Sequence, residues 1–397
     1  MDIALREIED ELPVLTNEIG DSWIYGTGSD PKKVSQFRAL RKFASTLEGE
    51  EKEHMLRNLI MIPEHTWGMD EKTHLDDNFH YKKEEFYPLR TAPNFLKMEA
   101  SWAEQRAYIT SAIDGLSPEN KLKAEALMAE YRRDPACTCG MTEIPAGEAV
   151  KLDGFKFVFN NKGEITSLIC KDKVLADENH RLGKFIYEQF CVEDFNRFYD
   201  QYTRGDYFWA VLDFKKIGME SGVDKHYTFT PEAKVFADGK KIVLKYSFDP
   251  VATERFGCPA ESDLVITVCD GAVHFDLAWC KKPANRMGEA LWFGFEPISE
   301  TKLIRKMGAW VDPETVIHKG GKRLHATDFG VKYDTLTIET VDAHLVAPQE
   351  PSLLNFIEDE PKDKGTYFNL HNNLWGTNFP MWYEDDARFR FVIKTEA

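Results

Sequence analysis

The chain has 397 residues, of which 43% are hydrophobic, 13% aromatic and 29% charged, and this composition excludes an intrinsically disordered or low-complexity chain. The formal net charge of -17 repels phosphate groups and anionic lipids, so we expect no nucleic-acid partner and no membrane partner. The chain also contains no uncharged apolar run near the roughly 18 residues of a membrane span, and its first ten residues lack the apolar core of a signal peptide.

Residues 1–29 fit neither of the two regions that follow them. Their one apolar segment, at 12–15, has the character of a short strand. A lone strand cannot pair its backbone or bury its faces. We therefore interpret residues 1–29 as the terminal remnant of an upstream α/β domain.

From residue 30 the apolar residues recur at spacings of three and four, which predicts helices. Asp30 followed by Pro31 is a typical helix start, and Pro63 ends a second helix. Two further helices are predicted after Pro93, beyond a long connection rich in histidine, aspartate and aromatic residues. The sequence thus predicts a small helical bundle over residues 30–135.

After this bundle, the apolar pattern changes to the alternation that is typical of strands. Asn161-Lys162-Gly163 and Asp270-Gly271 each separate two alternating runs, as hairpin turns do. We expect no helix comparable to those of the bundle in this part. The predicted fold class is α+β multidomain, with a large antiparallel β-sandwich over residues 145–397 that resembles the galactose-mutarotase supersandwich.

Three segments carry residues suited to a binding or catalytic site. The first includes Asp21, Trp23 and Tyr25. A carboxylate can bind hydroxyl groups or protonate a glycosidic oxygen, and aromatic rings stack on the apolar face of a sugar. This favours Asp21 as a catalytic residue and Trp23 and Tyr25 as substrate-binding residues. The alternative is that Asp21 caps a turn and Trp23 fills a domain interface.

The second segment contains His65, Trp67 and Asp70, followed by further histidines and aspartates. Imidazole and carboxylate groups together suit a divalent metal ion, provided that three ligands converge. His65 and Asp70 are therefore candidate metal ligands, and Trp67 is a candidate substrate-binding residue. A purely structural histidine is the alternative.

The third segment, residues 371–382, combines one histidine, three asparagines and two tryptophans. An amide side chain both donates and accepts hydrogen bonds, which suits neutral polyols, and tryptophan rings add stacking. Asn372, Asn373 and Trp375 are accordingly candidate substrate-binding residues. Alternatively, the loop binds its own backbone and holds one end of the sandwich together.

The seven cysteines are scattered along the chain, and only Cys137 and Cys139 lie close together. Their one-residue spacer matches neither a CxxC redox motif nor a usual zinc knuckle. We therefore expect reduced thiols and a cytoplasmic protein. The nucleophile elbow, the P-loop and the dinucleotide-binding glycine motif are all absent from the sequence.

The order of these features resembles family 38 of the glycoside hydrolases, the α-mannosidases. In those enzymes an aromatic residue, a Ser-x-Pro element and a long helix are followed by a Glu-His element, a bundle and a sandwich; here Trp23, Ser29-Asp30-Pro31 and Glu64-His65 match these elements. The chain is more similar to an uncharacterised bacterial branch related to them, in which residues 21–26, 65–70 and 372–379 look like signatures of the branch.

This resemblance implies a retaining hydrolase with a zinc ion that holds sugar hydroxyls. It places His65 at a zinc ligand and Asp21 near a proposed acid. The catalytic barrel, which carries the nucleophile and the other zinc ligands, has no counterpart in these residues. The resemblance therefore implies the helical-bundle and sandwich portion of such a protein, which binds or helps to hydrolyse a neutral carbohydrate, is inactive alone, and needs an upstream catalytic domain or subunit.

Two other functions stay open. The chain is alternatively a stand-alone carbohydrate-binding or scaffolding protein that binds glycan through the 372–382 loop without metal. It is alternatively an enzyme of the aldose-epimerase type, which requires a histidine and a carboxylate facing each other in the sandwich cleft. The candidates for that pair are His226, His274, Glu289 and Glu296.

Overall fold

The fold is described from a computed structural model of the chain. The structure describes residues 22–64, 66–203, 205, 207–315, 324–351, 353–355 and 365–395. The strand predicted at 12–15 lies outside these residues.

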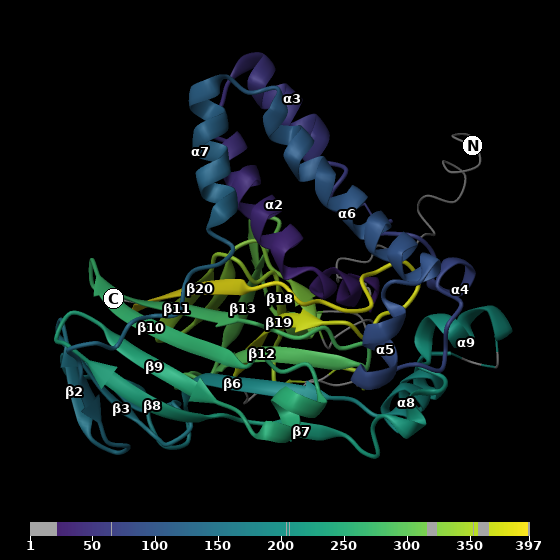
Figure 1. Cartoon of the computed structure of the whole chain (residues 1–397). Helices are drawn as coiled ribbons and strands as arrows, with labels where there is room; N and C mark the ends of the chain where they lie inside the picture. The colour runs from purple at the N-terminus through teal and green to yellow at the C-terminus, as the bar shows by residue number, and fades with distance from the viewer. Residues whose placement is uncertain are drawn as a thin grey trace, which may run out of the picture.

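The N-terminal part of the described chain is helical, as the apolar spacing predicts. Its elements are η2 (Ser22–Ser29), α2 (Pro31–Ala44), α3 (Gly49–Leu59), α4 (Glu71–His74), α5 (Lys83–Leu89), α6 (Pro93–Asp114) and α7 (Pro118–Ala129). Figure 1 shows α2, α3, α6 and α7 projecting as a bundle from one side of the sandwich, with α4 and α5 near its base. Leu40, Met55, Leu59 and Ile109 are buried together where these helices meet.

Asp30 fastens this bundle at the point where α2 begins. Its carboxylate accepts the backbone N–H of Lys33 at 3.0 Å, which caps the helix, and pairs with the Arg106 guanidinium of α6 at 2.6 Å. Burial raises the pKa of Asp30, but the charge and hydrogen bonds of Arg106 outweigh burial and hold the pKa below its usual value.

Substitutions of Asp30 separate these two contributions. Asp30→Ala removes the cap and the ion pair, and we expect it to lower the free energy of unfolding by about 3 kcal/mol. Asp30→Asn keeps an oxygen for the cap, so its cost should be about 1 kcal/mol smaller. Urea denaturation of both variants measures the difference, and equal losses would show that the cap contributes nothing.

Beyond the helices, the described strands form two antiparallel sheets of ten strands each. The first sheet has the order β1-β8-β9-β10-β11-β20-β17-β16-β13-β14. Its strands are β1 (Thr142–Ile144), β8 (Glu232–Ala237), β9 (Ile242–Ser247), β10 (Glu261–Cys269), β11 (Ala272–Cys280), β13 (Lys302–Lys306), β14 (Ala309–Val311), β16 (Gly330–Tyr333), β17 (Leu336–Thr340) and β20 (Ala387–Thr395).

The second sheet has the order β15-β18-β19-β12-β6-β4-β3-β2, with β5 paired to β4 and β7 paired to β6. Its strands are β2 (Ala149–Leu152), β3 (Phe155–Phe159), β4 (Ile165–Cys170), β5 (Lys173–Ala176), β6 (Leu182–Gln189), β7 (Tyr227–Phe229), β12 (Glu289–Phe295), β15 (His325–Ala326), β18 (Leu345–Ala347) and β19 (Thr366–Asn372). Phenylalanine rings of both sheets pack between them, including Phe275 against Phe293 and Phe391 against Phe368. The predicted helical bundle and β-sandwich are confirmed, including the hairpins β3–β4 and β10–β11.

The prediction that the second part has no helix comparable to those of the bundle is wrong. Between β6 and β7 lie α8 (Val192–Tyr202) and α9 (Phe208–Phe214), and short helical turns follow at η3 (Met219–Ser221), η4 (Val251–Arg255) and η5 (Pro313–Thr315). Val192, Phe195, Phe198 and Tyr199 of α8 are buried, a helical spacing within a region dominated by alternation. The long connection between Pro63 and Pro93 includes α4 and α5.

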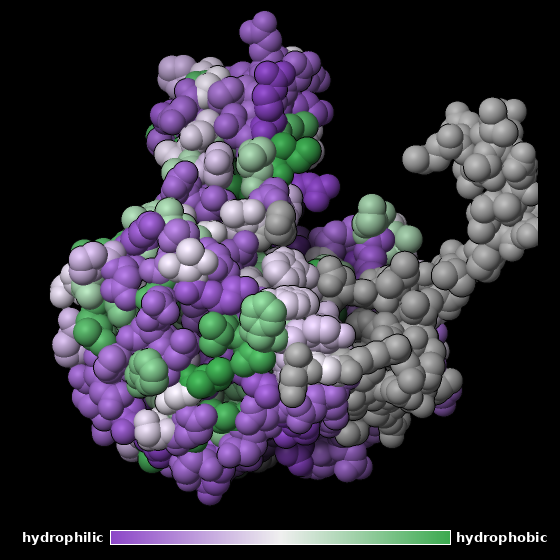
Figure 2. All heavy atoms as spheres, turned by 90° about the vertical axis from the view of Figure 1, so that its right-hand side faces the viewer, coloured by the Kyte–Doolittle hydropathy of each residue, from purple (hydrophilic) through white to green (hydrophobic). Residues whose placement is uncertain are grey.

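The surface of the molecule agrees with its composition. The view in Figure 2 shows a narrow helical part above a broader sandwich, with hydrophilic residues over much of the visible face. None of the helices in the described ranges has the length and apolar character of a membrane-crossing helix. The domain boundaries at 29, 135 and 145 stay predictions.

Candidate functional site

The predicted substrate-binding aromatic residues meet at the base of the bundle. Trp375 lies 6.0 Å from Trp23 and 5.9 Å from Tyr25 between ring centroids, and Phe379 lies 5.8 Å from Trp23 and 5.7 Å from Trp67. Tyr25, Trp67 and Trp375 are buried, and Trp23 is half-buried. In this structure the rings therefore pack η2 and the segment after α3 against the 373–386 loop.

The two predicted asparagines are buried next to this cluster. The Asn372 amide donates to the Tyr25 carbonyl at 2.9 Å. The Asn373 side chain accepts the Glu289 N–H at 2.7 Å and donates to the Met381 carbonyl at 2.9 Å. Both amides thus make hydrogen bonds within the fold, which tie η2, β12 and the 373–386 loop together.

The predicted catalytic residue, Asp21, and the predicted metal ligands, His65 and Asp70, are only partly described. Asp21 and His65 lie outside the described residues, while Asp70 caps α4 by accepting the Thr73 N–H at 3.0 Å and the Thr73 hydroxyl at 2.6 Å. Within the described ranges, no three histidine, cysteine, aspartate or glutamate side chains are grouped to hold a metal ion. A usable zinc site needs three protein ligands, so the described residues do not form one by themselves.

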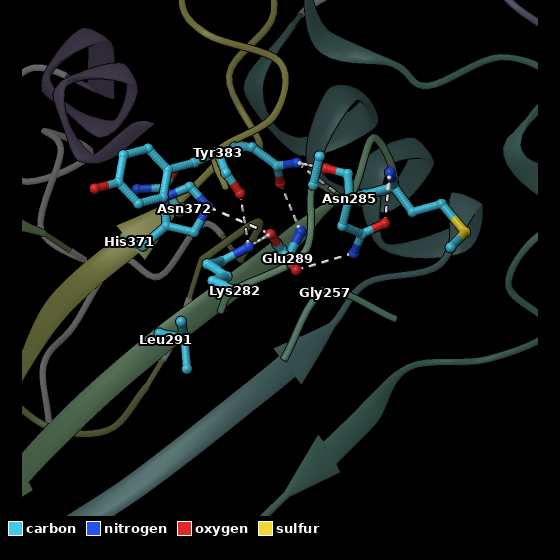
Figure 3. Close-up of polar contacts among 12 residues, drawn as sticks. Gly257, Lys282, Asn285, Glu289, Leu291, His371, Asn372 and Tyr383 are labelled. Atoms are coloured by element: carbon cyan, nitrogen blue, oxygen red, sulfur yellow. Dashed lines mark hydrogen bonds and ion pairs between the residues drawn. The ribbon is translucent and has the colours of Figure 1, made fainter. Parts of the chain in front are cut away.

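A buried ionic cluster lies beneath η2, at one end of the second sheet. Lys282, in the loop after β11, contacts the Glu289 carboxylate at 2.5 Å, and the His371 imidazole of β19 lies 3.4 Å from the same carboxylate. Figure 3 shows these side chains converging. The other carboxylate oxygen of Glu289 accepts hydrogen bonds from Tyr187 at 2.7 Å and Asn285 at 2.9 Å.

Burial controls the protonation of this cluster. Burial raises the pKa of Glu289, but the charge of Lys282 and the hydrogen bond to His371 outweigh it and lower the pKa to about 2. The pKa of His371 is lowered, chiefly because its ring is buried. At neutral pH the cluster is thus a lysine–glutamate ion pair beside a neutral imidazole.

This cluster is closed to solvent. The side chains of Lys282, Glu289 and His371 are fully buried, and the imidazole contacts the Gly28 carbonyl of η2 at 3.2 Å. A Cβ atom on Gly257 would lie 2.1 Å from the Glu289 carboxylate, so only glycine fits there. The cluster therefore connects η2 to the strands and offers no opening to a ligand.

An open cavity of about 450 Å³ lies elsewhere on the second sheet, beside α8. The residues that line it are Glu188, Phe190, Asp194, Arg197, His226, Pro351, Leu353 and Asn355. Glu188 lies on β6, which pairs with β7 directly after His226. This strand pairing brings the imidazole to the Glu188 carboxylate.

His226 lies between two carboxylates of this cavity. Its Nδ1 atom is 3.0 Å from Asp194 and its Nε2 atom is 3.3 Å from Glu188. Asp194 also accepts the Cys191 N–H at 3.0 Å, which caps α8, and pairs with Arg197 at 2.8 Å. Glu188 accepts the Trp292 indole N–H at 2.6 Å. Each carboxylate thus has at least one further hydrogen-bond partner besides His226, which fixes its position.

These contacts set the charge of the cavity. Burial lowers the pKa of His226, but the hydrogen bonds to Asp194 and Glu188 outweigh it and raise the pKa to about 9. Burial likewise opposes the ionisation of Asp194, and the hydrogen bonds from His226, Cys191 and Arg197 outweigh it and hold its pKa below the usual range. At neutral pH the wall therefore presents an imidazolium between two carboxylates.

The cavity combines the groups that a polyhydroxylated ligand needs. Glu188 and Asp194 offer carboxylate oxygens to hydroxyl hydrogens, whereas Arg197 offers N–H donors to hydroxyl oxygens. Phe190 and Leu353 add apolar surface, and the Phe190 ring lies 4.9 Å from the imidazole. Such a site suits a neutral sugar better than a strongly charged ligand, because its own charges are already paired.

Sequence reasoning named one residue of this cavity, His226, and missed Glu188, Asp194, Arg197 and Asn355. The position of Asp194 in the first turn of an amphipathic helix predicts a cap, but nothing in the sequence predicts its contact with a histidine 32 residues later. The other epimerase candidates lie apart: Glu289 faces His371, Glu296 pairs with Lys184 at 2.5 Å, and His274 lies on β11 opposite Thr267.

Residues 27–272 match the family described as Domain of unknown function (DUF5054). No curated protein sequence matches the chain. Among solved structures, an α-mannosidase from Enterococcus faecalis V583 is 10% identical with a TM-score of 0.39, and the match covers 66% of this chain and 30% of that one.

Two smaller proteins are also similar. A putative aldose 1-epimerase from Escherichia coli K12 is 11% identical with a TM-score of 0.33, over 65% of this chain and 99% of that one. A galactose mutarotase-like protein from Lactobacillus casei ATCC 334 is 10% identical with a TM-score of 0.35, over 65% of this chain and 100% of that one. This chain spans 30% of the length of the mannosidase that it matches.

Proposed function

Because this chain belongs to the family described as Domain of unknown function (DUF5054), whose description states no activity, we propose its function from the site itself. We propose that the chain binds a neutral carbohydrate in the cavity around His226. The observation that carries this proposal is an open cavity in which an imidazole is flanked by two carboxylates.

The size of the cavity supports this proposal. A volume of about 450 Å³ lies within the range of small-molecule sites, which is roughly 300–1,000 Å³. The side chain of His226 is 34% exposed, whereas those of Glu188 and Asp194 are below 10%, so a ligand reaches the imidazole first and the carboxylates beneath it.

Isothermal titration with glucose, galactose, mannose and their disaccharides tests the proposal. We expect at least one sugar to bind, and His226→Gln and Arg197→Met each to weaken its binding roughly tenfold or more, because each variant disturbs a buried carboxylate. His180→Gln is the matched control, since His180 also pairs with an aspartate, Asp177 at 2.8 Å, but does not line the cavity. Thermal melts establish that the variants fold, and the absence of binding to every sugar would refute the proposal.

A second candidate function is proton transfer during aldose mutarotation, and the contact of His226 with both carboxylates favours it. One carboxylate would take the proton of the C1 hydroxyl while the imidazolium gives a proton to the ring oxygen, which opens the ring. The contact of the imidazole with Glu188, at 3.3 Å, is longer than its contact with Asp194, at 3.0 Å. Glu188 is therefore the carboxylate that leaves the imidazole and takes the proton. Polarimetry of freshly dissolved aldoses, with Glu188→Gln as the inactive variant, tests this function.

The resemblance to family 38 glycoside hydrolases extends the first proposal. In that form, the chain is the bundle and sandwich portion of a larger assembly, and His65, Asp70 and Asp21 contribute to a zinc-dependent site that an upstream domain or subunit completes. Affinity for the same sugars, measured with zinc and with a chelator, separates the two sites: loss of binding in chelator supports the shared site, and unchanged affinity supports the His226 cavity.

We also propose a cytoplasmic location, because all seven cysteines are free thiols.

A further inference from the structure

The segment between α7 and β1 carries the closely spaced cysteines that the proposed function leaves unused. Cys137 and Cys139 are both exposed, whereas Cys191 and Cys258 are buried. Cys269 is the remaining exposed cysteine, and it lies on β10. The chain thus presents two neighbouring thiols at one point of its surface.

The chain before these thiols is fixed to the sandwich. Arg133 pairs with Asp263 at 2.6 Å and with Asp276 at 3.1 Å, and the Ala136 N–H donates to the Asp263 carboxylate at 2.8 Å. After the thiols, the Met141 N–H donates to the Thr138 carbonyl at 3.1 Å, and β1 then pairs with β8. The spacing of the two thiols is therefore held from both sides.

The thiols contact each other within this frame. The backbone N–H of Cys139 donates to the Cys137 sulfur at 3.2 Å. A hydrogen bond donated to a cysteine sulfur stabilises the thiolate, which is the reactive form. We propose that Cys137 and Cys139 form a reactive dithiol that a small disulfide, such as glutathione disulfide, oxidises to an internal Cys137–Cys139 disulfide.

The two sulfurs have different roles in this reaction. The hydrogen bonds from Cys139, with the charges of Lys241 and Lys245 nearby, lower the pKa of Cys137, while the same contact raises the pKa of Cys139. The Cys137 thiolate attacks the small disulfide, forms a mixed disulfide and releases one thiolate. Cys139 then loses its proton, attacks the Cys137 sulfur and releases the second thiol, so one disulfide is reduced as one forms.

Cys269 provides a control within the same chain. It is exposed like Cys137, but the Asp270 carboxylate lies 3.6 Å from its sulfur and raises its pKa by charge repulsion. At pH 7 we expect iodoacetamide to alkylate Cys137 at least about fivefold faster than Cys269, as followed by peptide mass spectrometry. Equal rates would contradict the activation of Cys137.

Oxidation with glutathione disulfide tests the second step. The unsubstituted chain should form the Cys137–Cys139 disulfide, with the loss of two hydrogens, and retain no glutathione on Cys137, whereas Cys139→Ser should keep glutathione on Cys137. Phenylarsine oxide, which binds two adjacent thiols, should protect the unsubstituted chain but not Cys139→Ser from iodoacetamide. A persistent mixed disulfide at Cys137 of the unsubstituted chain would overturn the proposal, and thermal melts of the exposed-site variants provide the folding control.

Discussion

Replacing Lys282 by methionine is expected to lower the free energy of unfolding at pH 7 by about 3–5 kcal/mol, the cost of removing one partner of a buried ion pair. The Lys282 ammonium contacts Glu289 at 2.5 Å and the Tyr383 carbonyl at 3.1 Å, and both charged side chains are fully buried. Without Lys282, burial raises the pKa of Glu289, so the loss should shrink when the pH is lowered to 5. Denaturation by urea at the two pH values measures both effects.

The neighbouring lysine provides the matched control. The side chain of Lys281 is 71% exposed and pairs with Glu261 at the surface, so Lys281→Met should leave the free energy of unfolding nearly unchanged. The pair Lys282→Met and Glu289→Gln, introduced together, should recover most of the loss, because the glutamine oxygen still accepts from Tyr187 and Asn285 without a buried charge. Equal effects at Lys281 and Lys282 would contradict the buried ion pair.

Acidification is expected to destabilise the protein through Glu289. Its pKa is about 2 in the fold, against 4.5 for the free side chain, so between these values the unfolded chain binds more protons. The stabilisation by ionised Glu289 is therefore complete above pH 4.5 and is lost as the pH falls toward 2. Between neutral pH and pH 3, this shift lowers the free energy of unfolding by about 2 kcal/mol. His371, whose lowered pKa keeps it neutral in the fold, acts in the same direction below pH 6.5.

Urea denaturation at pH 6, 5, 4 and 3 measures this dependence. The variant with both Lys282→Met and Glu289→Gln lacks the titrating carboxyl, so its free energy of unfolding should fall less steeply below pH 4.5. Parallel curves for the unsubstituted chain and this variant would show that Glu289 does not carry the acid sensitivity.

Local sequence signals predicted much of the fold. Asp30-Pro31 marks the start of α2, and the turns at 161–163 and 270–271 mark the hairpins β3–β4 and β10–β11. In each case, residues that are neighbours in the chain make the interaction that forms the element. The apolar residues of α8 have helical spacing, but the alternating pattern of the region around them favours strands, so the local pattern does not predict this helix.

The predicted site residues show where local reasoning ends. Rings and amides at Trp23, Trp67 and Asn372 have the chemistry of a sugar site. In the fold, however, both rings pack against Phe379 and the amide donates to the Tyr25 carbonyl. Composition states which chemistry a segment offers, but exposure depends on the elements that pack against it. The aromatic residues and asparagines that bind sugars are also the residues that fill interfaces and hold loops.

The amino-acid sequence alone determines the helical bundle, the antiparallel sandwich, the acidic net charge and the pair of neighbouring cysteines. The cavity around His226 follows from the pairing of β6 with β7 and the docking of α8, which bring residues 188, 194 and 226 within hydrogen-bonding distance. The pairing of Lys282 with Glu289 and His371 likewise depends on the assembled strands. Helix and turn signals act over a few residues, whereas these contacts join distant segments, and burial then sets the charge of each group.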